Sequence, residues 1–161
     1  MVINTSQRLP DTTYLQTGNW QDLGEVAQTI RHAVFVEEQR IPADLERDPA
    51  DAGCMHAVVF NATGQPVGTG RLLPLSDGVM KLGRLAVLRS WRGHGIGQAL
   101  LQALLEAARG QGAREVMLHA QQSAASFYLE AGFEPRGEEF MEAGIPHLEM
   151  VLGLQRGDRG Q

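Results

Sequence analysis

One segment constrains the fold of this chain more than any other. A segment suited to a strand covers residues 79–88, and a helix with one apolar face is expected over residues 96–108. Gly93, Gly95 and Gly97 lie where the helix begins. The free N–H groups of a helix N-terminus carry partial positive charge, and glycine lets a ligand approach the backbone closely. The segment therefore predicts a strand–loop–helix unit that binds a phosphate-bearing ligand.

The spacing of these glycines excludes two common phosphate-binding motifs. Gln98 stands where the dinucleotide fingerprint Gly-x-Gly-x-x-Gly requires its third glycine. Gly-Lys-Ser/Thr occurs nowhere in the chain, which excludes a P-loop. The pattern that remains is Arg92-x-x-Gly95-x-Gly97. A turn that only caps the helix is the alternative interpretation.

The other elements indicate an α+β fold with a mixed, mostly antiparallel sheet and helices on both faces. A parallel crossover is expected between the strand before the glycine loop and the strand after the helix. The sequence predicts one domain over residues 1–154 and a frayed tail over residues 155–161. The remaining predicted elements are helices at 21–39 and 123–131, an acidic loop at 40–54, and strands at 14–16, 55–61, 67–73, 116–118, 133–138 and 147–152.

Composition excludes several classes of protein. The net charge of -5 argues against a nucleic-acid or anionic membrane surface, because phosphate binding needs excess basic residues. The chain has a single cysteine, Cys54, so no internal disulfide can form and a reducing, cytoplasmic location is expected. Apolar runs are too short for a membrane-spanning helix, and the polar N-terminal residues do not resemble a signal peptide.

A second motif lies about thirty residues after the first. It reads Phe127-Tyr128-x-x-x-Gly132-Phe133 at the end of a short predicted helix. In order and spacing, the two motifs resemble the coenzyme A signatures of the GNAT N-acetyltransferase superfamily, over residues 79–152. The rest of the chain is similar to the ElaA-like subgroup in Arg31-x-x-Val34-Phe35-Val36-x-Glu38-Gln39, Glu46-x-Asp48-x-x-Asp51 and Phe140-x-Glu142-Ala143-Gly144-Ile145-Pro146-His147.

The resemblance implies that acetyl-CoA is the co-substrate and enters a gap where the strand before the glycine loop separates from the next strand at a bulge. Gln121 stands where many relatives carry Asn, and Phe127 would line the pantetheine channel. The strand backbone that would pair with pantetheine belongs to Leu85, Ala86 and Val87. The amides that would hold the pyrophosphate belong to Arg92, Gly93, His94, Gly95, Ile96, Gly97 and Gln98.

The resemblance also implies catalytic roles. Tyr128 corresponds to the family's general acid, which would protonate the departing thiolate; a buried tyrosine with a satisfied hydroxyl is the alternative. The general base is left open among His119, Glu142, His147 and Glu38. For either histidine, a ring that only bonds to backbone is the structural alternative.

Acidic residues concentrate around the end of the first helix and the loop after it. These carboxylates could attract a cationic acceptor, but a solvated acidic loop is the expected interpretation. The loop lacks the spacing of a calcium site, and Cys54 and His56 lack further zinc ligands, so no metal is predicted. The residues concerned are Glu37, Glu38, Glu46, Asp48 and Asp51.

The expected function is therefore N-acetyl transfer from acetyl-CoA to a primary amine of a small molecule or peptide, by direct attack in a ternary complex. Two alternatives remain: an acyl-homoserine-lactone-type acyltransferase and a coenzyme A-binding module without turnover. The sequence does not set the oligomeric state, and a homodimer is one option.

Overall fold

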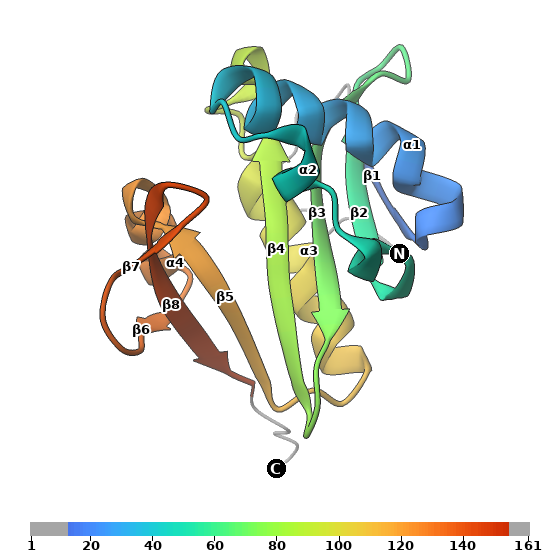
Figure 1. Cartoon of the computed structure of the whole chain (residues 1–161). Coiled ribbons are helices and arrows are strands. Elements are labelled where there is room, and N and C mark those ends of the chain that lie inside the picture. The colour runs from blue at the N-terminus through green and yellow to red at the C-terminus, as the bar shows by residue number, and fades with distance from the viewer. Residues whose placement is uncertain (1–12, 155–161) are drawn as a thin grey trace.

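The computed structural model describes residues 13–154; residues 1–12 and 155–161, including the predicted tail, lie outside the described part. Its centre is an eight-stranded sheet in the order β1-β2-β3-β4-β5-β8-β6, with β7 paired to β8 (Figure 1). Among the strands of residues 13–154, only β4 and β5 pair in parallel, as the predicted crossover requires. The strands are β1 Tyr14–Gly18, β2 Met55–Phe60, β3 Pro66–Pro74, β4 Val79–Val87, β5 Glu115–Gln121, β6 Glu134–Pro135, β7 Phe140–Glu142 and β8 Ile145–Gly153.

Helices lie on both faces of the sheet, as predicted. The helix α1 covers one face of β2, β3 and β4, and α3 packs on the opposite face of the same strands (Figure 1). The α-helices are α1 Trp20–Arg31, α2 Ala43–Glu46, α3 Ile96–Gly110 and α4 Ala125–Glu130; a π-helical segment covers His32–Glu38, and 3-10 turns cover Pro49–Gly53, Arg89–Trp91 and Gln122–Ala124.

Local sequence explains the two long helices. The side chain of Asn19 accepts a hydrogen bond from the amide of Asp22 (2.9 Å) and so caps α1. Apolar side chains at spacings of three and four form the buried stripe of each helix. After α3 the chain turns through Gly112, whose φ of +80° few other residues adopt at low cost. The stripe residues are Leu23, Ala27 and Ile30 in α1 and Ile96, Leu100, Ala103 and Leu104 in α3.

The strands β4 and β5 separate along their length, which creates the space for a site. Parallel pairing joins Val79–Lys81 to Glu115–Met117 and does not continue beyond them (Figure 1). On the other edge of β4, Thr69 pairs with Ala86 while Arg71 pairs with Gly83, so β4 holds one extra residue. Arg84 lies in this bulge with a φ of +51°. A bulge of this kind bends a strand and redirects its side chains.

Three predicted elements differ in detail. The helix predicted to residue 39 forms, but its last part is π-helical over His32–Glu38. The segment predicted as a loop over 40–54 contains α2 and a 3-10 turn. The strand predicted at 133–138 shortens to Glu134–Pro135, and the separate strand β7 precedes β8. None of the described helices is long and apolar enough to cross a membrane.

Candidate active site

A cavity of about 580 Å³ occupies the gap between β4 and β5. Side chains from both faces of the sheet line it, because the gap passes through the sheet. Of the residues predicted for the site, Gly93, His94, Gly95, Ile96 and Gln98 do not line the cavity but flank it in the glycine loop. The predicted residues that do line it are Leu85, Ala86, Val87, Arg92, Gly97, His119, Gln121, Phe127, Tyr128, Glu142 and His147.

The glycine loop leaves a row of backbone amides without acceptors. Gly93 and Gly95 adopt φ values of +83° and +80°, and no side chain caps the start of α3. Ala99 is the first residue of this helix whose amide donates, to the carbonyl of Gly95 (3.0 Å). Among the described residues, the amides of 93–98 have no hydrogen-bond partner. These amides and the positive end of the helix dipole form an anion site at one end of the cavity.

The guanidinium of Arg92 is held by contacts within the protein. Its Nη atoms donate to both carboxylate oxygens of Glu38 (2.8 and 2.7 Å), and its Nε–H donates to the carbonyl of Val87 (2.9 Å). Arg89 lies 3.3 Å from the same carboxylate. The hydrogen bond from Arg92 lowers the pKa of Glu38. Glu38 is therefore held ionised outside the cavity lining, where it fixes the loop to the π-helical segment.

Tyr128 lies on the cavity wall and is buried. Its ring packs edge-on against Phe127 and Phe133, with centroids 5.0 and 5.8 Å away. Burial raises the pKa of Tyr128 to about 12, so the hydroxyl stays protonated at neutral pH. Its hydroxyl has no hydrogen-bond partner among residues 13–154, unlike a purely structural buried tyrosine. A protonated, unused donor therefore lies at the cavity.

His119 and Glu142, which the sequence offered as separate candidates for the base, lie together. His119 Nδ1 on β5 is 3.0 Å from Glu142 Oε1 on β7, and the contact crosses β8, which pairs with both strands. Its Nε2 lies 3.6 Å from Glu149 Oε1. Leu118 and Ala120 face the α3 side, so His119 points to the opposite side of the sheet. A carboxylate on Nδ1 fixes the orientation of the imidazole ring.

His147 and Gln121 also line this side of the cavity. His147 Nδ1 lies 2.7 Å from the carbonyl oxygen of Ile145; since a carbonyl only accepts, Nδ1 carries the proton. The Gln121 amide exchanges two hydrogen bonds with the Gln39 amide (2.8 and 3.4 Å). This pair joins the end of the π-helical segment to the end of β5. In this structure the Gln121 amide is thus directed to Gln39.

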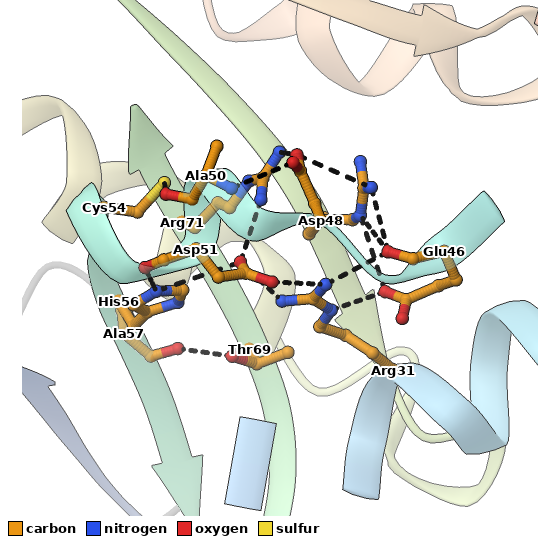
Figure 2. A network of polar contacts seen from close by, with 11 residues as sticks. Arg31, Glu46, Asp48, Ala50, Asp51, Cys54, His56, Ala57, Thr69 and Arg71 are labelled. Atoms are coloured by element: carbon orange, nitrogen blue, oxygen red, sulfur yellow. Dashed lines mark hydrogen bonds and ion pairs between the residues drawn. The ribbon is translucent and has the colours of Figure 1, made fainter. Parts of the chain in front are cut away.

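The acidic segment forms a buried ion network, and the prediction of a solvated loop is wrong (Figure 2). Arg31 donates to Asp51 (2.9 and 3.0 Å) and to the carboxylate of Glu46. Arg71 donates to Asp51 (2.8 Å) and Asp48 (2.7 Å). Glu46 and Asp51 are only 5% and 2% exposed, so these two carboxylates cannot recruit a cationic acceptor from solvent.

The same network brings Asp51, Cys54 and His56 together, with ligand atoms within 4.8 Å. The carboxylate of Asp51 is already bonded to Arg31 and Arg71, whose charges repel a cation. His56 Nε2 lies 3.0 Å from the Asp51 carbonyl, and burial raises the pKa of the Cys54 thiol. These contacts indicate a structural cluster and not a metal centre.

Replacing Asp51 by Asn is expected to lower the free energy of unfolding by about 3–5 kcal/mol at pH 7, because two buried guanidinium groups lose their carboxylate. Burial alone would raise the pKa of Asp51, but hydrogen bonds from Arg31 and Arg71 outweigh it and lower the pKa. The stabilisation is thus present above the ordinary carboxyl pKa and is lost as pH falls through the lowered value. Urea denaturation at pH 7 and at acidic pH measures both effects.

The exposed Asp44 provides the control for this experiment. Asp44→Asn should change the free energy of unfolding by at most about 0.5 kcal/mol. An equally small change in Asp51→Asn would contradict the structural role of the network.

Comparisons with known proteins agree with this geometry. The family model described as "Acetyltransferase (GNAT) domain" matches residues 13–154. The chain is 42% identical over 123 residues to YjcF of Bacillus subtilis, described as an uncharacterised N-acetyltransferase; the match covers 76% of this chain and 86% of YjcF.

Two solved structures are informative. The crystal structure of Escherichia coli ElaA has a TM-score of 0.78 and 28% identity, covering 86% of this chain and 98% of ElaA. The acyl-homoserine lactone synthase BjaI, described as CoA-dependent, has a TM-score of 0.74 and 20% identity, covering 89% of this chain and 84% of BjaI; it shares the fold. With the family model and these relatives, the chain belongs to the GNAT acetyltransferase family and is an acyltransferase.

Proposed function

We propose that this protein transfers an acetyl group from acetyl-CoA to a primary amine of a small molecule or peptide, by direct attack within a ternary complex. One observation carries the proposal: the cavity in the β4–β5 gap ends at the free amides of residues 93–98. A thioester carrier with a diphosphate fits such a site, because the amides can bind the diphosphate while the arm enters the gap. The single cysteine favours a cytoplasmic location as part of the same proposal.

The backbone of β4 would hold the reactive end of the coenzyme. Beyond Lys81, the edge of β4 that faces β5 has no strand partner, so N–H groups within Leu85–Val87 are available to the pantetheine arm. One of these N–H groups would stabilise the oxyanion of the tetrahedral intermediate. Phe127 lines the same cavity and lies close to Gly97, because a Cβ added at Gly97 would be 3.7 Å from its ring. The ring would therefore border the pantetheine arm.

Two side chains would move the protons. His119, oriented by Glu142, would accept a proton from the ammonium of the acceptor so that the nitrogen can attack the thioester carbon. The carbon–nitrogen bond forms, the carbon–sulfur bond breaks, and Tyr128 donates a proton to the departing thiolate. His119 is favoured over Glu38 because Glu38 is paired with Arg92 outside the cavity lining.

Thiol release from acetyl-CoA, measured with a panel of primary amines, tests the proposed function. Amine-dependent release with formation of the acetylated amine is the expected result. Saturable coenzyme binding without release for any amine would favour a non-catalytic coenzyme A-binding module. Including S-adenosylmethionine and longer acyl-CoA donors in the panel tests the acyl-homoserine-lactone-type alternative, since the BjaI structure contains S-adenosylmethionine and isopentyl-CoA.

Replacing His119 by Gln is expected to lower kcat by roughly 10²–10⁴-fold, the usual effect of losing a general base. Steady-state thiol release at saturating acetyl-CoA measures this effect. His32→Gln is the matched control, because His32 also faces a glutamate (Glu37, 3.3 Å) but is exposed and does not line the cavity. Equal kcat values in the two variants would remove His119 from the mechanism.

A further inference from the structure

The face of β4 that looks toward α2 carries a group of basic side chains in the cavity. Met80 and Leu82 point into the core beneath α3, so Lys81 and Gly83 point the other way. In a regular strand, residues 81 and 84 would lie on opposite faces. The bulge at Arg84 adds one residue, and Arg84 therefore shares the Lys81 face, where it reaches the Glu46 carbonyl (3.0 Å).

Lys81 is the only lysine of the chain. Its side chain lines the cavity and makes no hydrogen bond or ion pair with any of residues 13–154. The ion network next to it contains equal numbers of the two charges, three arginines and three carboxylates: Arg31, Arg71 and Arg84 with Glu46, Asp48 and Asp51. Lys81 therefore adds one net positive charge to this wall.

Arg84 is itself incompletely compensated. It contacts Glu46 and Asp48 through Nε and Nη2 (3.4 and 3.9 Å to the carboxylate oxygens), whereas its Nη1 has no partner among the described residues. Burial, followed by repulsion from Arg71 and Arg31, lowers the pKa of Arg84. The surroundings of this guanidinium thus favour a further anion.

Open space lies between these two cations. Gly83 lines the cavity, and a Cβ added there would meet nothing within 4 Å. Across the gap lie His119 and Glu142, the pair that would receive an ammonium group. The cavity thus has a cationic wall on β4 and a histidine–glutamate pair on the β5 and β7 side.

From this arrangement, which rests on the proposed function, we propose that the acceptor is an amino-carboxylate: its carboxylate binds Lys81 and Arg84 above Gly83, and its amine faces His119 and Glu142. The separation of charge on the two walls matches the two charged groups of such a molecule. A bound carboxylate would receive charge-assisted hydrogen bonds, which are stronger than neutral ones. Lys81 is then a specificity-determining residue for the acceptor.

Calorimetric titration of the coenzyme A complex tests this inference separately from turnover. The probes are α- and ω-amino acids, each compared with its own carboxamide, which keeps the amine but removes the negative charge. At least one acid should bind about tenfold more tightly than its carboxamide, equivalent to about 1.4 kcal/mol. If no acid binds better than its carboxamide, including the case in which neither binds at millimolar concentration, the inference is overturned.

Substitutions test whether the preference for acids over carboxamides comes from the cationic wall on β4. Lys81→Met should lower the acid-to-carboxamide ratio several-fold, with Arg84 retaining part of the preference, whereas Arg109→Met, which removes an equal charge from the exposed end of α3, should leave the ratio unchanged. Gly83→Val should weaken binding of acid and carboxamide alike by filling the open space, and it provides a test that does not depend on folding of the lysine variant. An unchanged ratio in Lys81→Met, or unchanged binding in Gly83→Val, contradicts the inference.

The proposed acetyltransferase activity and the proposed carboxylate subsite can fail separately. Thiol release with carboxamides but no preference for acids would retain the amine acetyltransferase and remove the carboxylate subsite. Preferred binding of acids without thiol release for any amine would retain the subsite and remove the proposed activity.

Discussion

Replacing Tyr128 by Phe is expected to lower kcat by roughly 10²–10⁴-fold, the typical effect of losing a general acid. The substitution removes only the hydroxyl, and the ring can keep its edge-on packing against Phe127 and Phe133. Because that hydroxyl has no partner among the described residues, its loss leaves no other buried polar group unsatisfied. Acetyl-CoA affinity should therefore change far less than turnover, which calorimetry and thiol release measure separately.

The chain supplies a matched control and a pH test for this role. Tyr14, the other tyrosine, is 50% exposed at the sheet edge, and Tyr14→Phe should keep wild-type turnover. Since burial raises the pKa of Tyr128 to about 12, this acid stays protonated up to about pH 10 and should cause no loss of activity below that pH. Wild-type turnover in Tyr128→Phe would remove Tyr128 from the mechanism.

Replacing Gly95 by Asp is expected to abolish measurable binding of acetyl-CoA. The new carboxylate would lie among the amides of residues 93–98 and repel the diphosphate at the start of α3. Titration of acetyl-CoA into wild-type and variant protein by calorimetry measures the effect. Circular dichroism and thermal unfolding of the variant check that the fold is retained.

Gly95→Asn separates charge from backbone strain. Gly95 has a φ of +80°, and Asn and Asp tolerate this region better than other side chains and to a similar degree. Asn matches Asp in size but is neutral, so Gly95→Asn should keep most of the affinity that Gly95→Asp loses. Equal affinities in wild type and both variants would place the diphosphate elsewhere.

The candidate site was predictable where its signal is local in the sequence. The glycine loop of 92–97 carries its own chemistry, because the free amides follow from glycine spacing at a helix start. Tyr128 follows from its place in the second motif, and its burial agrees with that placement. The parallel pairing of β4 with β5 follows from the order strand, helix, strand.

The partners of charged side chains were not predictable, because they join segments far apart in the chain. Arg31 lies on the apolar stripe of the first helix, and Arg71 lies within an apolar strand. These positions on apolar faces indicate that both arginines are buried, and a buried guanidinium needs a carboxylate partner. Which carboxylates they meet depends on how α2 and the 3-10 turn of Pro49–Gly53 pack against the sheet. The Arg92–Glu38 ion pair likewise depends on the path of the π-helical segment.

A structure of the complex with coenzyme A tests the central claim most directly. The account predicts that the pyrophosphate oxygens accept hydrogen bonds from amides between residues 93 and 98, and that the pantetheine arm runs between β4 and β5 past Phe127. A diphosphate bound at any other surface, with the β4–β5 gap left without the pantetheine arm, would contradict it.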